Sequence, residues 1–418
     1  MDSTYDIINF TIRINLERSL FMEKKKRGFF HSLLFKLLVA ILVGILLGKS
    51  LGSSGIQVVD AIKQIMGDFI GYIVPLIILG FITPAIVSLK ESAGKILTVT
   101  LIICYLSSVG AACFSFLAGQ AIIPGLHIQS AVAQGAEIPE AVFRLEIAPI
   151  MPVMTALITA ILFGIAVIWT QSKTWENLLI ELNQIVLTIV EKVVITILPV
   201  YIAATFAELA YEGVLLSQFP VFIKVIFIVL LGHFIWMALL YSLGGILSKS
   251  SPKEVFRYYV PAYMTAVGTM SSAATVSVAL ACARKSKVLD PKIRDFVIPL
   301  CSDTHLCGSV LTETFFVMVV SQILYGQLPP TNSMILFILL LGIFAIAAPG
   351  VPGGTVVASL GLITSVLHFD NTGTALILSI FALQDSFGTA CNITGDGAIA
   401  LMVTGIFKRE KAKQTKEV

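Results

Sequence analysis

The stretch QDSFGTACNITGDG (384–397) stands between two apolar runs, TALILSIFAL and AIALMVTGIF. It carries Asp385, Asn392 and Asp396, and neither the stretch nor its apolar flanks contain a lysine or an arginine. A carboxylate at the centre of a membrane helix costs at least about 2.5 kcal/mol on insertion scales, and such residues usually mark a substrate or ion pathway. The stretch therefore predicts a functional site inside a membrane-spanning helix.

Four polar side chains of this stretch follow one another at helical spacing: Asp385, Thr389, Asn392 and Asp396. Steps of four, three and four residues place them on one face of a helix. Hydrogen bonding between helices would explain Thr389 and Asn392, but it explains two acids without a cation poorly. Glycines on both sides of Asp396 leave backbone carbonyls accessible, and hard cations such as Na⁺ prefer oxygen ligands. This face is predicted to bind a mobile cation: a metal ion, a proton or a substrate ammonium group.

The composition is that of an integral membrane protein. Of the 418 residues, 57% are hydrophobic and 13% are charged, and the mean hydropathy is +0.94; a soluble domain carries roughly 25% charged residues. The six cysteines lie in or beside apolar segments, so a disulfide framework is not expected. The positive residues gather at the ends of segments and give no reason to expect a nucleic-acid partner.

Apolar runs of about 20 residues predict an all-α membrane protein. The expected crossing helices number eight and lie near residues 31–50, 68–89, 96–122, 149–172, 178–207, 219–247, 293–325 and 373–407. Two other segments are read as re-entrant hairpins. Residues 259–283 are rich in small polar residues, and residues 334–366 are broken by AAPGVPGG. Each hairpin precedes a helix with polar residues at mid-depth, so the two units form an apparent inverted repeat, which points to a transporter's binding site.

Lysine and arginine predict the orientation, because they accumulate in cytoplasmic loops. They crowd both ends of the chain and the loops on both sides of 259–283, whereas 326–333 and 367–372 contain none. Both termini are therefore expected in the cytoplasm, and the two hairpins should enter from opposite sides. Residues 1–30 are read as a cytoplasmic extension, with 1–21 dispensable because MEKKKRG from Met22 resembles a start site, and 408–418 as a basic cytoplasmic tail.

A second polar segment reads PLCSDTHLCGSVLTETFF (299–316). In a continuous helix His305, Ser309 and Glu313 would share a face, but Gly308 and the density of polar residues favour a break. Glu313 has no obvious cation partner and is predicted to carry a proton, because burial favours the neutral form of a carboxyl group. The alternative is a hydrogen-bonded core glutamate without a role in transport.

Four residues of that segment alternate: Cys301, Asp303, His305 and Cys307. An extended backbone would place them on one side, as in a site for a soft metal. No second cluster of such residues supports that reading, and His305 is more often a satisfied buried histidine than a ligand.

The two hairpin tips are built from small residues. In GTMSSAATVS (268–277), Ser271 and Ser272 offer hydroxyl and amide groups to a carboxylate beside a helix N-terminus; close packing of small residues is the alternative. The second tip cannot be a continuous helix, because it contains two prolines and three glycines. It is the expected moving gate.

Three motifs in this order, MSSAAT (270–275), APGVPGG (348–354) and NITGDG (392–397), resemble the dicarboxylate/amino acid:cation symporters, the family with the glutamate-transporter fold. The resemblance covers about residues 31–407. It implies a homotrimer that works by an elevator mechanism. Residues 31–248 would form mainly the trimerisation scaffold, with the third and sixth crossing helices packed on a transport core at 259–407.

The resemblance also implies roles for single residues. Asp396 would bind Na⁺, Asn392 would contribute to both Na⁺ and substrate, and Asp385 would hold the substrate amino group. The other matched positions are Thr389 as a neighbouring substrate contact, Ser272 for the substrate carboxylate and Gly353 in the gate. Ser271 and Ser309 are assigned to the same pocket.

Departures from the family pattern change the expected ligands. The family's NMDGT stands here as HLCGS (305–309), which removes the side chains of one Na⁺ site. Cys301 and His305, together with Asn392 and Asp396, are assigned to the sodium-binding region that remains. Glu313 falls where proton-coupled members carry their glutamate, which supports its proposed proton.

Where members that take acidic substrates have an arginine, this chain has Gly388. The acid that supports that arginine is replaced by Phe381, and the alternative arginine position in the first tip is Met270. No guanidinium is left for bidentate capture of a side-chain carboxylate, so Gly388 argues against glutamate and aspartate as substrates.

The resulting prediction is a plasma-membrane importer of a neutral or polar amino acid, or a similar small zwitterion. It would be coupled to Na⁺, with H⁺ as a second candidate coupling ion and without another cofactor. A dicarboxylate or another organic anion is the alternative substrate. An intramembrane hydrolase using Ser272 or Ser309 with His305 is less favoured, because no G-x-S-x-G or H-E-x-x-H motif occurs, and a channel is disfavoured by the two broken hairpins.

Overall fold

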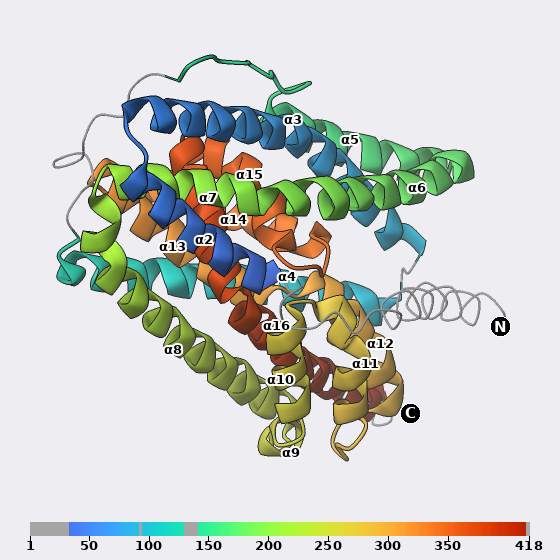
Figure 1. The fold of residues 1–418 in the computed structure, drawn as a ribbon. Helices are drawn as coiled ribbons and strands as arrows, with labels where there is room; N and C mark the ends of the chain where they lie inside the picture. Colours follow the sequence, from blue (N-terminus) through green and yellow to red (C-terminus); the bar gives the residue numbers. More distant parts are fainter. Residues whose placement is uncertain (1–32, 92–93, 129–140, 415–418) are drawn as a thin grey trace.

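The computed structural model is built from helices throughout the residues that it describes, which are 33–91, 94–128 and 141–414 (Figure 1). The cytoplasmic extension expected at residues 1–30 lies outside the described residues and stays a prediction. The described part of the chain begins with α2 (Leu33–Ser50) and ends with α16 (Asn371–Gln414), which contains the whole stretch 384–397 as uninterrupted helix.

Seven helices of the described part are long and apolar enough to cross a membrane, which makes this a multi-pass membrane protein. They comprise α3 (Ser53–Glu91), α4 (Lys95–Ile122), α5 (Val153–Thr170), α6 with α7 (Lys173–Ile189, Ile195–Tyr211), α8 (Val214–Ser248), α12 with α13 (Pro291–Thr304, Cys307–Tyr325) and α16. Residues 190–194 form a π-helical turn that joins α6 to α7. α2, which covers the first expected crossing, is not among these seven.

The two interrupted segments form pairs of short helices. The first pair is α10 (Val260–Thr269) with α11 (Ser272–Ala283), and the second is α14 (Thr331–Ala347) with α15 (Gly354–Ser365). Between α10 and α11 the chain turns through Met270, whose φ of 54° is left-handed. The tips of the two hairpins meet, because Ser271 Oγ donates to the carbonyl of Gly350 at 2.7 Å.

The helices pack in two groups. The second hairpin contacts α3, which belongs to the first group, and α4, which belongs to the second. In the first group α2 and α3 pack on α7, and α5 and α6 pack on α3; in the second, α4 packs on α13, α8 packs on α16, and both hairpins contact α16. Figure 1 shows α3, α5 and α6 along one edge of the molecule, and α8 with α10–α12 on the other. The division into scaffold and transport core remains a prediction.

A close helix contact ties α2 to α7. A Cβ atom on Gly44 would lie 2.3 Å from the carbonyl oxygen of Ala203, and one on Gly48 would lie 2.0 Å from that of Ala207. Glycines four residues apart let two helix backbones approach at a distance that no other residue permits, a common device in membranes.

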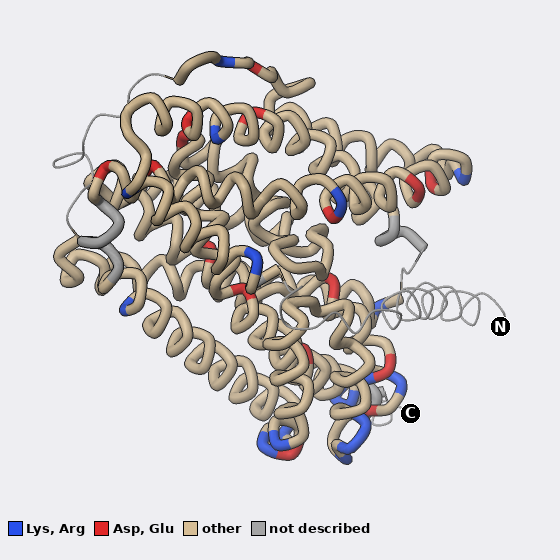
Figure 2. Tube along the Cα trace, viewed as in Figure 1, with Lys and Arg blue, Asp and Glu red and all other residues tan. Residues whose placement is uncertain are grey.

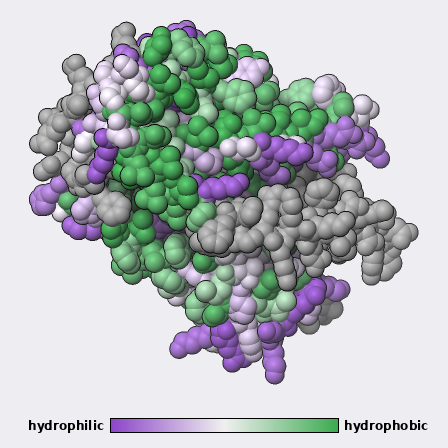
Figure 3. All heavy atoms as spheres, in the orientation of Figure 1, coloured by the Kyte–Doolittle hydropathy of each residue, from purple (hydrophilic) through white to green (hydrophobic). Residues whose placement is uncertain are grey.

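The surface agrees with a membrane environment. Figure 3 shows hydrophobic side chains over much of one face, and large apolar residues such as Leu231, Ile246 and Trp169 are exposed on α8 and α5. Figure 2 shows lysine and arginine gathered at the loops that flank α9 (Lys253–Phe256) and at the turn between α11 and α12. These are the loops that the sequence predicts to be cytoplasmic.

A buried ion pair joins α3 to α7 where the sequence predicted no helix. The second crossing was expected to begin at residue 68, but α3 begins at Ser53, and its added turns carry Lys63. The Lys63 ammonium donates to the Glu208 carboxylate and, at 3.1 Å, to Thr372 Oγ1 of α16. Asp60 lies 3.7 Å from the same ammonium. The charge of Lys63 is therefore neutralised inside the protein, so the helix can begin well before it.

Replacing Lys63 alone should destabilise the protein far more than replacing the pair. Lys63→Met leaves the Glu208 carboxylate buried without its cation, at a cost of about 3–5 kcal/mol, whereas an apolar replacement of both partners is often close to neutral. Thermal unfolding in detergent should show a large loss for Lys63→Met and substantial recovery for Lys63→Met combined with Glu208→Leu. Equal stabilities of the single and double variants would contradict this account.

Candidate functional site

A small cavity lies beneath the two hairpin tips, against α13 and α16. Its empty volume is about 200 Å³, and it is lined by Met270, Ser272, Leu306, Ser309, Pro349, Gly350, Val351, Thr355, Asp385, Thr389 and Asn392. Five of the predicted substrate residues are therefore brought together: Ser272, Ser309, Asp385, Thr389 and Asn392. They come from α11, α13 and α16, with 37 positions between Ser272 and Ser309 and 76 between Ser309 and Asp385, so their meeting follows from the packing of these helices.

The polar face of α16 divides between two environments. Asp385, Thr389 and Asn392 line the cavity, as their spacing predicts. Asp396 continues the same stripe but is not among the lining residues, and its side chain contacts α12 through His305. A shared helix face therefore did not ensure a shared site.

Asp385 connects α16 to the second hairpin tip. Its Oδ2 accepts a hydrogen bond from the backbone N–H of Gly353 at 2.7 Å. Gly353 has a φ of 70°, a conformation that glycine adopts without strain. The amide group that meets Asp385 is thus presented by a backbone turn that few other residues would allow.

The two serines of the first tip have different surroundings. Ser271 caps α11, since its Oγ accepts from Ala274 N at 3.2 Å, and it also donates to the Gly350 carbonyl of the other tip. Ser272 is the first residue of α11 and lines the cavity. Ser271 therefore holds the two tips together, while Ser272 faces the space where a ligand would lie.

The polar segment 299–316 is broken, as predicted, at His305 and Leu306. α13 begins at Cys307, and the first amides of a helix need acceptors. Asn392 supplies one: its Oδ1 accepts from Gly308 N at 2.7 Å and from Ser309 N at 3.2 Å. Its Nδ2 donates to Ser309 Oγ at 2.9 Å. Asn392 thus caps α13 and sets the position of Ser309 in the cavity.

Gly308 permits the contact between α13 and α16. A Cβ atom there would lie 2.5 Å from both the Gly388 carbonyl oxygen and Cys391 Cβ. At Gly388 a Cβ atom would meet Ser309 at 3.5 Å, an ordinary contact. The close approach therefore requires glycine at residue 308, whereas the absence of a side chain at residue 388 is not a packing requirement.

His305 is held between α4 and α16, where it is fully buried. Its Nδ1 lies 2.9 Å from Asp396 Oδ1, and its Nε2 lies 2.8 Å from Ser107 Oγ. Asp396 was expected to have no partner within the chain, because neither lysine nor arginine is near it in the sequence. That expectation was wrong, since His305 is its partner. The reading of His305 as a satisfied buried histidine agrees with the contacts of both ring nitrogens.

Sequence reasoning missed two polar residues that support the break. Ser107 of α4 holds His305, and His233 of α8 places its Nε2 at 3.1 Å from the Gly308 carbonyl and 2.9 Å from Thr312 Oγ1. Both stand in otherwise apolar crossing helices. A polar residue in such a run was a signal, but nothing in the sequence named its partner.

Glu313 lies away from the cavity, against the second hairpin. Its Oε1 accepts a hydrogen bond from Ser359 Oγ of α15, and its Oε2 makes no hydrogen bond with the residues that the structure describes. The helix breaks between residues 304 and 307, so His305 does not share the face on which Ser309 and Glu313 lie four residues apart on α13. Glu313 is placed to respond to the position of α15.

The sulfur-rich surroundings of His305 do not form a metal centre. Cys104 Sγ and Cys301 Sγ lie 3.6 Å apart, and a Cβ atom on Gly395 would lie 3.4 Å from Cys307 Sγ. Within residues 33–91, 94–128 and 141–414, no group of three or more His, Cys, Asp or Glu side chains is placed to hold a metal ion. The alternating residues 301–307 are also not extended, since α12 continues to Thr304.

The residues around Asp396 fit a sodium ion poorly. One carboxylate oxygen is engaged by His305, and the neighbouring thiols are soft groups, whereas a hard cation prefers oxygen ligands. Oδ2 of Asp396 makes no hydrogen bond with described residues and is the remaining oxygen of this carboxylate.

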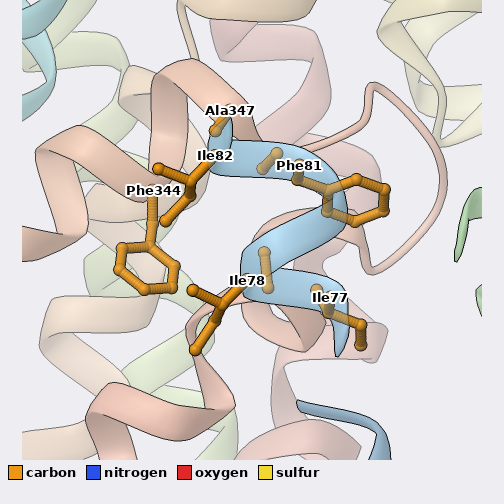
Figure 4. A pocket seen from close by; sticks show the side chains of 8 residues that line it. Ile77, Ile78, Phe81, Ile82, Phe344 and Ala347 are labelled. Atoms are coloured by element: carbon orange, nitrogen blue, oxygen red, sulfur yellow. The ribbon is translucent and has the colours of Figure 1, made fainter. Parts of the chain in front are cut away.

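A second cavity is entirely apolar. It has an empty volume of about 150 Å³ and lies between α3 and the second hairpin, where Ile78 and Ile82 lie on the side of α3 toward Phe344 (Figure 4). A zwitterion needs polar groups to orient it, and this cavity offers none. It is an apolar contact between the hairpin and α3, and it does not compete with the polar cavity as a substrate site.

Ser107 should contribute to stability through its contact with His305, and its neighbour provides the control. Ser107→Ala leaves Nε2 of a fully buried imidazole without its partner, at a cost of about 1–3 kcal/mol. The hydroxyl of Ser108 makes no hydrogen bond with described residues, so Ser108→Ala should change the unfolding temperature much less. The two variants would be compared by thermal unfolding in detergent, and equal losses would show that the Ser107 contact adds nothing.

Comparison with known proteins gives a match over most of the chain. The model of the sodium:dicarboxylate symporter family matches residues 33–406. Excitatory amino acid transporter 1 of Ambystoma tigrinum is 25% identical over 250 residues, which are 57% of this chain and 44% of that protein. The human protein of the same name is 26% identical over 211 residues, 50% of this chain and 38% of that protein.

A nematode protein is similar over a shorter segment. The putative sodium-dependent excitatory amino acid transporter glt-6 of Caenorhabditis elegans is 27% identical over 164 residues, 39% of this chain and 30% of that protein. The matched region thus spans less than half the length of each of these relatives. Their names describe what those proteins transport.

Proposed function

We propose, from the premise that this chain belongs to the sodium:dicarboxylate symporter family, that it is a cation-coupled symporter of a small neutral or polar amino acid. The family is one of transporters, which sets aside the intramembrane hydrolase. The observation that carries the proposal is the polar cavity beneath two meeting hairpin tips, in which Asp385 is the one charged residue among those that line it.

Asp385 is the proposed partner of the substrate ammonium group. It is buried, and one of its oxygens accepts from the Gly353 amide of the second tip. A buried carboxylate is costly unless it is paired, and an ammonium group would pair with it where the second tip closes. Binding of substrate and closure of that tip would then be linked through one carboxylate.

The N-terminus of α11 is the proposed partner of the substrate carboxylate. Ser272 is its first residue, and the amides of a helix N-terminus favour negative charge. Ser309, oriented by Asn392, and Thr389 offer further hydroxyl groups in the same cavity. The two charged ends of a zwitterion would therefore meet α16 on one side and the first hairpin on the other.

The lining residues favour a neutral substrate side chain. They include no lysine or arginine, and the Asp385 carboxylate would repel a second negative charge. A dicarboxylate, the other substrate class in the family's name, would need a cation that these residues do not supply.

The remaining predictions complete the proposal. α2 would be the eighth crossing helix, both termini would lie in the cytoplasm, and the protein would act as a homotrimer in the cell membrane. The hairpins with α12, α13 and α16 would move as a transport core past α3 and α7. The apolar contact between α3 and the second hairpin supports this movement, because apolar surfaces have no directional bonds to break.

Transport can be tested in proteoliposomes with labelled amino acids and dicarboxylates, while Na⁺ and pH gradients are imposed separately. Uptake of neutral amino acids should require one of the gradients. Asp385→Asn should weaken the binding of a zwitterion roughly 10- to 100-fold, because a charge-assisted pair is worth about 1.5–3 kcal/mol. Ser386→Ala is the control, since its hydroxyl makes no hydrogen bond with described residues. Uptake indifferent to both gradients would contradict symport.

Glu313 is the proposed proton carrier, and Glu313→Gln tests it. Glutamine keeps an oxygen that can accept from Ser359 but has no proton to exchange, so uptake driven by a pH gradient should be lost while uptake driven by Na⁺ persists. The control is Thr314→Val, whose native hydroxyl makes no hydrogen bond with described residues. An unchanged response to the pH gradient would remove Glu313 from the mechanism.

A further inference from the structure

We propose that His305 occupies the place of a coupling sodium ion at Asp396, so that this chain supplies the partner of that carboxylate from its own sequence. The inference rests on the proposed function, because it concerns how many sodium ions accompany the substrate. It departs from the family resemblance, which assigns Asp396 to sodium binding.

His305 and Asp396 are in direct contact. Nδ1 of His305 lies 2.9 Å from Asp396 Oδ1. When Asp396 is ionised its carboxylate only accepts hydrogen bonds, and Nδ1 then carries the hydrogen and points it at the oxygen that a cation would bind. Ser107 Oγ lies 2.8 Å from Nε2 on the opposite side of the ring. The imidazole is held from both sides, by α4 and α16, and cannot turn away without breaking two contacts.

The space beside Asp396 is occupied by side chains of the same protein. The sequence suggested that the neighbouring glycines expose backbone carbonyls to a cation. In the structure a Cβ atom on Gly395 would lie 2.9 Å from His305 Cε1, and one on Gly397 would lie 2.6 Å from Tyr241 OH and 2.8 Å from the Tyr259 ring. These glycines leave room for side chains of the same protein.

The surroundings of His305 are rich in sulfur. The His305 ring lies within hydrogen-bond reach of Cys307, and the thiols of Cys104 on α4 and Cys301 on α12 lie 3.6 Å apart in the same buried region. Sulfur and imidazole groups are poor ligands for a hard cation. Oδ2 of Asp396 has no hydrogen-bond partner among the described residues. A sodium ion bound to Oδ2 beside the imidazole is therefore the competing arrangement that an experiment must distinguish.

The inference has a direct consequence for coupling. If His305 replaces one cation, the stability of the native protein should depend on the Na⁺ concentration less steeply than the stability of a variant that lacks the imidazole. Asp396→Asn should leave this dependence unchanged, because the asparagine oxygen still accepts from Nδ1 and no sodium ligand is lost. Under the family reading, the same substitution removes the charge that binds sodium.

The test measures the unfolding temperature of the purified full chain in lipid nanodiscs over a NaCl series, with choline chloride keeping the ionic strength constant. A ligand that binds the native state raises stability with the logarithm of its concentration, so the slope counts bound ions. His305→Asn, which restores the family's residue, should steepen the slope by about one sodium ion. Ser108→Ala serves as the control for substitution in this buried region.

The outcomes separate the inference from the proposed function. A flatter slope for Asp396→Asn than for the native chain would overturn the inference, even if uptake in proteoliposomes is driven by Na⁺. Folded His305→Asn with an unchanged slope would overturn it as well. A steeper slope for His305→Asn, with Asp396→Asn equal to the native chain, would support it, including the case in which uptake by the native protein proves independent of Na⁺.

Discussion

The break between α12 and α13 leaves the first amides of α13 without helical partners, and Asn392 of α16 supplies their acceptor. Water is scarce at membrane depth, so irregular backbone survives there only where the protein or a polar cavity satisfies it. This one side chain fixes the register between α13 and α16. Ser309, Asp385 and Thr389 come to one cavity because that register is fixed.

The same requirement explains why the two hairpin tips meet. Ser271 of the first tip donates to the carbonyl of Gly350, and Gly353 of the second tip donates to Asp385. Each tip thus supplies a hydrogen bond to a polar group beside the cavity, and the backbone N–H of Ala273 also donates to the Gly350 carbonyl. Opening one tip would exchange these hydrogen bonds for contacts with a ligand. A gate needs such a balance.

The sequence predicted several of these features from local chemistry. Pro349 and Pro352 exclude a continuous helix at the second tip, and the small residues around Ser271 indicate the first. The spacing of Asp385, Thr389 and Asn392 predicted one helix face, and those three residues do line one cavity. The second crossing was expected to begin near residue 68, but α3 begins at Ser53, fifteen residues earlier, and the sequence could not show that Glu208 neutralises Lys63 within the added turns.

By itself the sequence determined the class of the protein, the places where helices must break and the polar residues that enter the membrane, because each of these follows from the hydrophobicity, backbone geometry and spacing of neighbouring residues. The tertiary structure decided which polar residues meet. Asp396 and His305 are separated by 91 positions, and Ser107 lies on a third helix. Only the packing of α4, α12 and α16 shows that the acid is paired with an imidazole, because partners at membrane depth are chosen by proximity in space.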